Sequence, residues 1–200
     1  MGATETASIA SFASLSSQLL AVGAPSELIE LAHRDAIDEI VHARLCYDIA
    51  RDLDGRALGA DAFPAATLPL DRQPTVASLA LECLRESCVL EAASAKAAAA
   101  LADGASDRRI AEVLQTIADD EARHALHGWQ MLDWLRAELD GDPGFEAVLD
   151  RLRRSVPRAV VDHDRFETMG LAGPALWERS VQEAIADADV RLRGALPAAA

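Results

Sequence analysis

Residues 120–124 read Asp-Glu-Ala-Arg-His, and residues 38–42 read Asp-Glu-Ile-Val-His. Both copies of this Asp-Glu-x-x-His pattern lie inside long segments with the periodicity of an α-helix. Residues three apart share one face of a helix, so each Glu-x-x-His directs a carboxylate and an imidazole to the same side. One copy is weak evidence, because helices rich in Ala and Glu contain it by chance. Two copies, each preceded by Asp, predict a helical bundle that holds two metal ions.

The composition favours an all-α protein with a sizeable core. The chain has 200 residues, half of them hydrophobic and only 4% aromatic, and β-branched runs are scarce. A net charge of −14 argues against a basic surface for nucleic acid. We expect no membrane span and no targeting leader, hence a cytoplasmic protein. Three cysteines, Cys46, Cys83 and Cys88, favour thiols in a reducing compartment over a disulfide framework.

Helical periodicity and turn residues predict four main helices joined as two hairpins. Two short turns, at 23–26 and 103–106, make antiparallel neighbours, whereas the Gly- and Pro-rich stretch 54–74 suits a crossover along a bundle. Ser106 is the expected N-cap of the fourth helix. The connectivity is that of a four-helix bundle with one long crossover. The helices are expected at residues 4–22, 26–54, 75–102 and 107–140.

The C-terminal part is expected to be a helical extension that packs on this bundle. Helices are predicted at about 145–161, ending near Pro157, and at about 174–193, opening at Pro174. We therefore divide the chain into a bundle of residues 1–141 and an extension of residues 142–200.

Each predicted hairpin contributes one further carboxylate on its leading helix. Glu5 and Glu91 stand in similar contexts, Glu-Thr-Ala-Ser and Glu-Ala-Ala-Ser, and each comes level with the Glu-x-x-His of its own hairpin. Glu86 is an alternative to Glu91 as the ligand. We favour Glu91, because its neighbours on the inner face of the helix are small. Four buried carboxylates are costly unless cations bind them. Oxygen and imidazole ligands without thiolates suit iron or manganese.

Asp38 and Asp120 precede the two motifs and suit a supporting role. A metal-bound imidazole usually donates its other N–H to a carboxylate, so Asp38 could serve one histidine and Asp120 the other. Across an antiparallel pair, these would be His124 and His42 respectively.

The motifs resemble those of the ferritin-like di-iron superfamily over about seven tenths of the chain. Residues 120–124 match its Asp-Glu-x-Arg-His form, and the surroundings of Glu5 and of residues 38–46 resemble bacterial ferritin-like domain-containing proteins of unassigned activity. The resemblance implies a ferritin-like four-helix bundle and two iron ions, with manganese or a mixed pair as alternatives. It also implies that Arg123 pairs with a supporting carboxylate. The implied metal ligands are Glu5, Glu39, His42, Glu91, Glu121 and His124.

The expected function is oxidation of a small organic substrate by dioxygen or peroxide at the metal centre, with no catalytic residue beyond it. An oxygenase would also need an electron donor, and a homodimer is one compatible assembly. Small residues, namely Cys46, Cys88 and Gly128, are expected to line a substrate pocket that Trp177 or Phe166 closes. The alternatives are a ferroxidase or other iron-handling protein, and a peroxide-removing di-metal protein with Fe or Mn.

Overall fold

In a computed structural model, all regular secondary structure of the described residues is helical. The structure describes residues 1–55, 59, 62, 73–157, 167 and 169–194, and these ranges contain no strand. Internal contacts divide the chain into two compact units, residues 1–79 and residues 80–200. Within the described ranges no helix is both long and apolar enough to cross a membrane.

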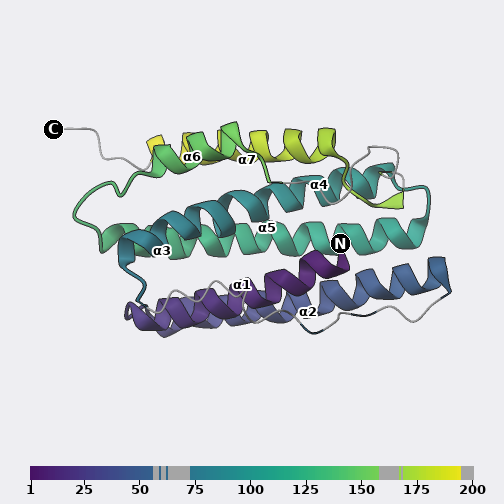
Figure 1. Cartoon of the computed structure of the whole chain (residues 1–200), viewed down its shortest axis with the longest axis horizontal. Coiled ribbons are helices and arrows are strands. Elements are labelled where there is room, and N and C mark those ends of the chain that lie inside the picture. The colour runs from purple at the N-terminus through teal and green to yellow at the C-terminus, as the bar shows by residue number, and fades with distance from the viewer. Residues whose placement is uncertain (56–58, 60–61, 63–72, 158–166, 168, 195–200) are drawn as a thin grey trace. The chain divides into compact units, whose positions relative to one another are not determined.

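The first unit is built on a helical hairpin, α1 (Gly2–Ala21) and α2 (Ser26–Asp54). The two helices pack along each other, as Figure 1 shows. Gly23 takes a positive φ of 77° between them, a backbone conformation that L side chains rarely adopt. The apolar core of this hairpin is small, and buried polar groups extend it. The buried apolar residues of the two helices are Phe12, Leu15, Leu19, Ala32 and Ala43.

The second hairpin pairs a composite helix with α5 (Arg108–Ala137). The composite helix is α3 (Val76–Cys83), the π-helix η2 (Leu84–Leu90) and α4 (Glu91–Gly104), joined without a break. Both η2 and α4 pack against α5. The N-cap of α5 is Asp107, whose carboxylate accepts hydrogen bonds from the backbone of Arg109 and Ile110. The prediction of Ser106 as the cap is therefore wrong by one residue, because the chain turns into the helix only after Asp107.

The π-helix is the main departure from the predicted single helix over 75–102. In η2 the backbone hydrogen bonds join residues five positions apart. At its end, for example, the N–H of Glu91 donates to the carbonyl of Glu86. Gly128 of α5 lies against this segment: a Cβ added to Gly128 would come 2.6 Å from the carbonyl oxygen of Ser87. The close approach of the two backbones thus depends on a glycine 41 positions further along the chain.

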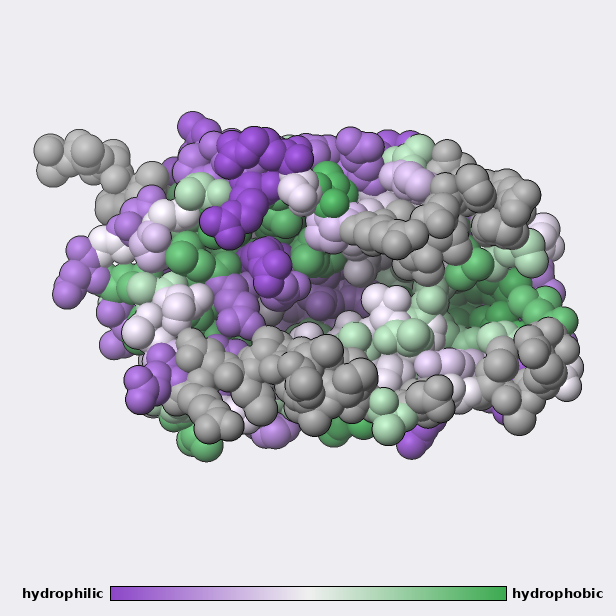
Figure 2. Space-filling view, viewed as in Figure 1, coloured by the Kyte–Doolittle hydropathy of each residue, from purple (hydrophilic) through white to green (hydrophobic). Residues whose placement is uncertain are grey.

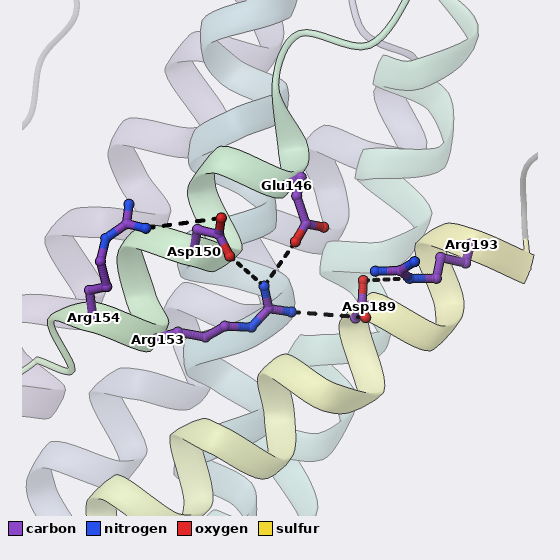
Figure 3. Close-up of polar contacts among 6 residues, drawn as sticks. All are labelled: Glu146, Asp150, Arg153, Arg154, Asp189 and Arg193. Carbon is purple, nitrogen blue, oxygen red and sulfur yellow. Dashed lines mark hydrogen bonds and ion pairs between the residues drawn. The ribbon is translucent and has the colours of Figure 1, made fainter.

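The C-terminal helices α6 (Phe145–Arg154) and α7 (Pro174–Gly194) pack within the second unit. α7 contacts α4, η2 and α6. Arg153 joins the two helices, since it pairs with Glu146 at 2.9 Å, Asp150 at 2.7 Å and Asp189 at 3.9 Å (Figure 3). Hydrophilic side chains gather along both helices on the face shown in Figure 2. These ion pairs are partly exposed, so each contributes little stability.

Several predicted features lie wholly or mostly outside the described residues. They are the crossover over 54–74, Phe166 as a lid, and the end of the 145–161 helix; the described helix α6 ends at Arg154, before Pro157. Whether residues 1–141 form one four-helix bundle stays a prediction.

Candidate metal centre

The first unit holds a buried cluster of two carboxylates and one imidazole. Glu5 comes from the first turns of α1, and Glu39 and His42 lie three apart on α2. Ligand atoms of these three residues lie within 4.8 Å of one another. All three side chains are buried, and His42 is fully inaccessible. α1 begins at Gly2, two residues before the expected start, and Glu5 lies in its first turn.

The second unit holds a cluster of the same composition. Glu91 opens α4, and Glu121 and His124 lie three apart on α5. Nδ1 of His124 lies 3.6 Å from Oε2 of Glu91 and 3.8 Å from Oε2 of Glu121. In the first unit, Nδ1 of His42 lies 3.6 Å from Oε1 of Glu39. The two hairpins therefore repeat one arrangement.

These distances suit ligands of a common ion better than hydrogen bonds. Hydrogen bonds between nitrogen and oxygen are about 2.7–3.2 Å long, so the 3.6 Å between His42 Nδ1 and Glu39 Oε1 is too long for one. Two ligands that are each about 2.1 Å from an ion lie roughly 3.0–4.2 Å apart. Carboxylates buried away from water are also costly unless a cation offsets their charge. The donor set of each cluster thus fits a divalent metal.

Glu91, not Glu86, is the carboxylate that the structure brings to His124. The side chain of Glu86 is 38% exposed and pairs with Arg85. Partial burial raises the pKa of Glu86, an effect that the guanidinium of Arg85 opposes. Glu86 and Glu91 are five positions apart. In a regular α-helix two residues at this spacing point to different faces, so only one of the two could face the site.

The structure gives a contact for some of the predicted supporting residues and leaves others untested. Asp120 pairs with Arg123 at 2.7 Å on α5, and a supporting role of this pair at a metal stays a prediction. The predicted bonds from Asp38 to His124 and from Asp120 to His42 would join residues of different units, and they stay predictions. Sequence reasoning missed Asp35, which is 1% exposed and lies one turn before Glu39 on α2. Its spacing of four from Glu39 could have indicated it.

Two of the predicted pocket residues, Cys88 and Gly128, belong to the second unit. Cys88 is buried, and Gly128 lies against the backbone of Ser87. Cys46 of α2 is half-buried in the first unit. A cavity of about 660 Å³ lies elsewhere in the second unit, between the end of α5, the start of α6 and the end of α7. Its lining includes Arg136, Leu139, Phe145, Asp189, Leu192 and Arg193.

Fold and site together define an all-helical protein with buried carboxylate–histidine clusters that could bind metal. No known family, curated protein or solved structure matches the chain. The ferritin-like assignment therefore depends on the motifs and on the clusters themselves.

Proposed function

We propose that each cluster binds one divalent metal ion, so that the chain is a di-metal carboxylate protein. The observation that carries this proposal is the repetition of one set, two carboxylates and one imidazole, in both hairpins, with every member buried except the half-buried Glu91. Glu5, Glu39 and His42 would hold one ion, and a second would lie with the cluster of α4 and α5.

Iron or manganese fits these ligands best. The proposed ligands are carboxylate oxygens and imidazole nitrogens, and none of the three cysteines belongs to either cluster. Carboxylates favour hard cations, imidazole suits iron, and thiolates would be needed to favour a structural zinc or an iron–sulfur site. Two iron ions are therefore the leading assignment, with manganese or a mixed pair as alternatives.

The proposed reaction is an oxidation driven by dioxygen or peroxide. When two iron ions are bound, they supply two electrons together to such an oxidant. The residues of the chain have other tasks. The carboxylates neutralise the ions, His42 and His124 fix their positions, and burial of both imidazoles excludes bulk water, which strengthens electrostatic interactions inside the site.

The packing at Gly128 favours a small reactant, and it supports a second candidate function. A bulky organic substrate needs space beside the metal, whereas Gly128 lies so close to the backbone of Ser87 that even an added Cβ would not fit there. Peroxide, dioxygen and ferrous iron need no such space. Removal of peroxide or oxidation of ferrous iron is therefore the second candidate.

Anaerobic loading followed by a measured dose of oxidant tests these functions. The protein is loaded with Fe²⁺ or Mn²⁺, desalted, and given dioxygen or hydrogen peroxide while oxidant consumption is recorded. We expect consumption in proportion to bound metal, and at most half of the wild-type consumption per chain in a His124→Ala variant. Release of dioxygen from peroxide would identify peroxide removal, and continued turnover of added Fe²⁺ would identify a ferroxidase. Metal-loaded protein that consumes neither oxidant would refute all three activities.

A further inference from the structure

Cys83 and Cys88 form a buried thiol pair outside both metal clusters. Each is 1% exposed. The thiol of Cys83 donates a hydrogen bond to the carbonyl oxygen of Gly128, with 3.3 Å between sulfur and oxygen. The Cys83 thiol is close enough to that of Cys88 to raise its pKa, through a side-chain hydrogen bond and charge repulsion that add to burial. The two sulfur atoms are therefore neighbours at the contact between η2 and α5.

The π-helix brings these cysteines together. In a regular α-helix, Cα atoms five residues apart are about 8.7 Å from each other, beyond the roughly 7 Å that a disulfide can span. A π-turn bonds residue i to residue i+5, so such residues lie one above the other, as residues four apart do at about 6 Å in an α-helix. Cys83 directly precedes η2, and Cys88 is five residues further on. The spacing matches one π-turn.

We propose that Cys83 and Cys88 are a modification site, at which hydrogen peroxide converts the dithiol to a disulfide. The sulfur of Cys83 attacks one peroxide oxygen and the O–O bond breaks. The other oxygen leaves as water with the thiol proton, and Cys83 becomes a sulfenic acid. The sulfur of Cys88 then displaces the hydroxyl of that sulfenic acid, which leaves as the second water with the thiol proton. Two thiols and one peroxide thus give one disulfide and two waters.

Burial makes this reaction slow and dependent on local opening. The thiolate is the nucleophile in such chemistry, and burial together with the hydrogen bond to Cys83 keeps the proton on Cys88. Local opening of a helix segment exposes such groups transiently. The half-exposed Cys46 should therefore react first with any thiol reagent, and the buried pair later.

A disulfide here would also disturb the metal cluster of the second unit. The sulfur atoms must approach to about 2.05 Å, with Cβ atoms about 3.8 Å apart, which requires the turn between Cys83 and Cys88 to move. Glu91 follows η2 directly, so it is expected to shift away from His124. This consequence depends on the proposed function, whereas formation of the disulfide does not.

Trypsin provides a direct test, because Arg85 lies between the two cysteines. A Cys46→Ser variant is treated with hydrogen peroxide, alkylated under denaturing conditions and digested without reductant. We expect peptides 73–85 and 86–96 to be joined by a disulfide, and to separate after reduction. A Cys46→Ser/Cys83→Ser variant, the matched control, should give no such link. In the wild-type protein the same two peptides should be joined, and peptide 45–51 should not.

Persistence of two free thiols, or oxidation of either cysteine to a sulfinic or sulfonic acid in place of the link, would overturn the proposal. A second arm measures Fe²⁺ or Mn²⁺ bound before oxidation, after it, and after reduction with dithiothreitol. We expect loss of one ion per chain, restored by reduction. A disulfide that leaves metal binding unchanged would refute the effect on Glu91. Failure of the reduced protein to bind metal would refute the proposed function instead.

Discussion

Glu91 and Glu86 show how one residue position distinguishes a ligand from a surface group. Oε2 of Glu91 lies 3.6 Å from Nδ1 of His124, whereas Glu86 is partly exposed and paired with Arg85. The two side chains have the same chemistry, so the difference between them is entirely one of placement. They form a matched pair for mutagenesis.

Glu91→Gln should lose metal affinity, and Glu86→Gln should not. The amide keeps the volume of the side chain but removes the negative charge that stabilises a bound cation. We expect a loss at least as large as the roughly 10- to 100-fold that follows loss of an outer partner. Isothermal titration with Mn²⁺ under identical conditions measures both variants. Equal affinities in the two would contradict the assignment of Glu91.

Cys88 should make the stability of the protein fall at alkaline pH. Burial raises its pKa well above the ordinary value of 9.0, the hydrogen bond to Cys83 adds to this, Arg191 opposes it and Asp133 supports it. A raised pKa in the folded state means that the thiol contributes stability below pH 9, and that this contribution is lost as the pH rises further. The slope for one proton reaches about 1.4 kcal/mol per pH unit.

Urea unfolding at a series of alkaline pH values measures this loss. The wild-type free energy of unfolding should fall more steeply above pH 9.0 than that of a Cys88→Ser variant, whose hydroxyl does not titrate in this range. Parallel curves would show that the thiol is accessible in the folded protein.

At the scale of elements, the contact between α5 and η2 depends on the absence of a side chain at Gly128. A Cβ there would meet backbone atoms of Ser87 at 2.6 and 2.7 Å, and backbone cannot rotate away as a flexible side chain can. Gly104, at the end of α4, has nothing within 4 Å of an added Cβ. The two glycines are therefore a suitable pair for comparison.

Gly128→Ala should destabilise the protein by about 1–3 kcal/mol, the usual cost of overpacking. Gly104→Ala should be neutral or stabilising by up to about 1 kcal/mol, because alanine is the better helix former. Urea unfolding of both variants measures the difference. Equal stabilities would mean that η2 can move away from α5 at little cost.

The sequence predicts helices well where local signals determine their ends. α2 runs from Ser26 to Asp54, the range expected from Pro25 before it and Gly55 after it. The π-helix was not predicted, because side chains such as Leu84 and Cys88, four positions apart, also fit one face of a regular α-helix. The sequence pattern alone does not distinguish the two kinds of helix here. The π-helix forms at a contact with Gly128, which is distant in the sequence. No local pattern contains that information.

The candidate site, like the helices, was predictable where its residues belong to a local sequence motif. The two Glu-x-x-His motifs are local, and each brings its carboxylate and imidazole together as helical spacing requires. Glu86 and Glu91 both lie on the one helix predicted over 75–102, so the sequence left Glu86 as an alternative. Asp35 was missed because a single Asp among the polar residues of α2 carries no motif.

At the scale of the whole molecule, charge and stability should both respond to metal. The chain carries a net charge of −14, and buried carboxylates add repulsion that bound cations relieve. A ligand that binds only the folded state stabilises it by about 2.7 kcal/mol at a free concentration 100 times its Kd. Metal should therefore raise the melting temperature, and a chelator should reverse the change.

Thermal unfolding with Mn²⁺, with Mn²⁺ plus chelator, and without metal measures this effect. A His42→Ala/His124→Ala double variant is the control, and its melting temperature should not respond to Mn²⁺. A response of the same size in the double variant would place the binding on surface carboxylates.

The central claim, two buried clusters that each bind one ion, is tested most directly by metal stoichiometry. The wild-type protein, His42→Ala and His124→Ala are loaded anaerobically with Fe²⁺, desalted and assayed for metal and protein. We predict two ions per wild-type chain and at most one in each single variant. Retention of two ions by both single variants, or of none by the wild-type protein, would contradict the account.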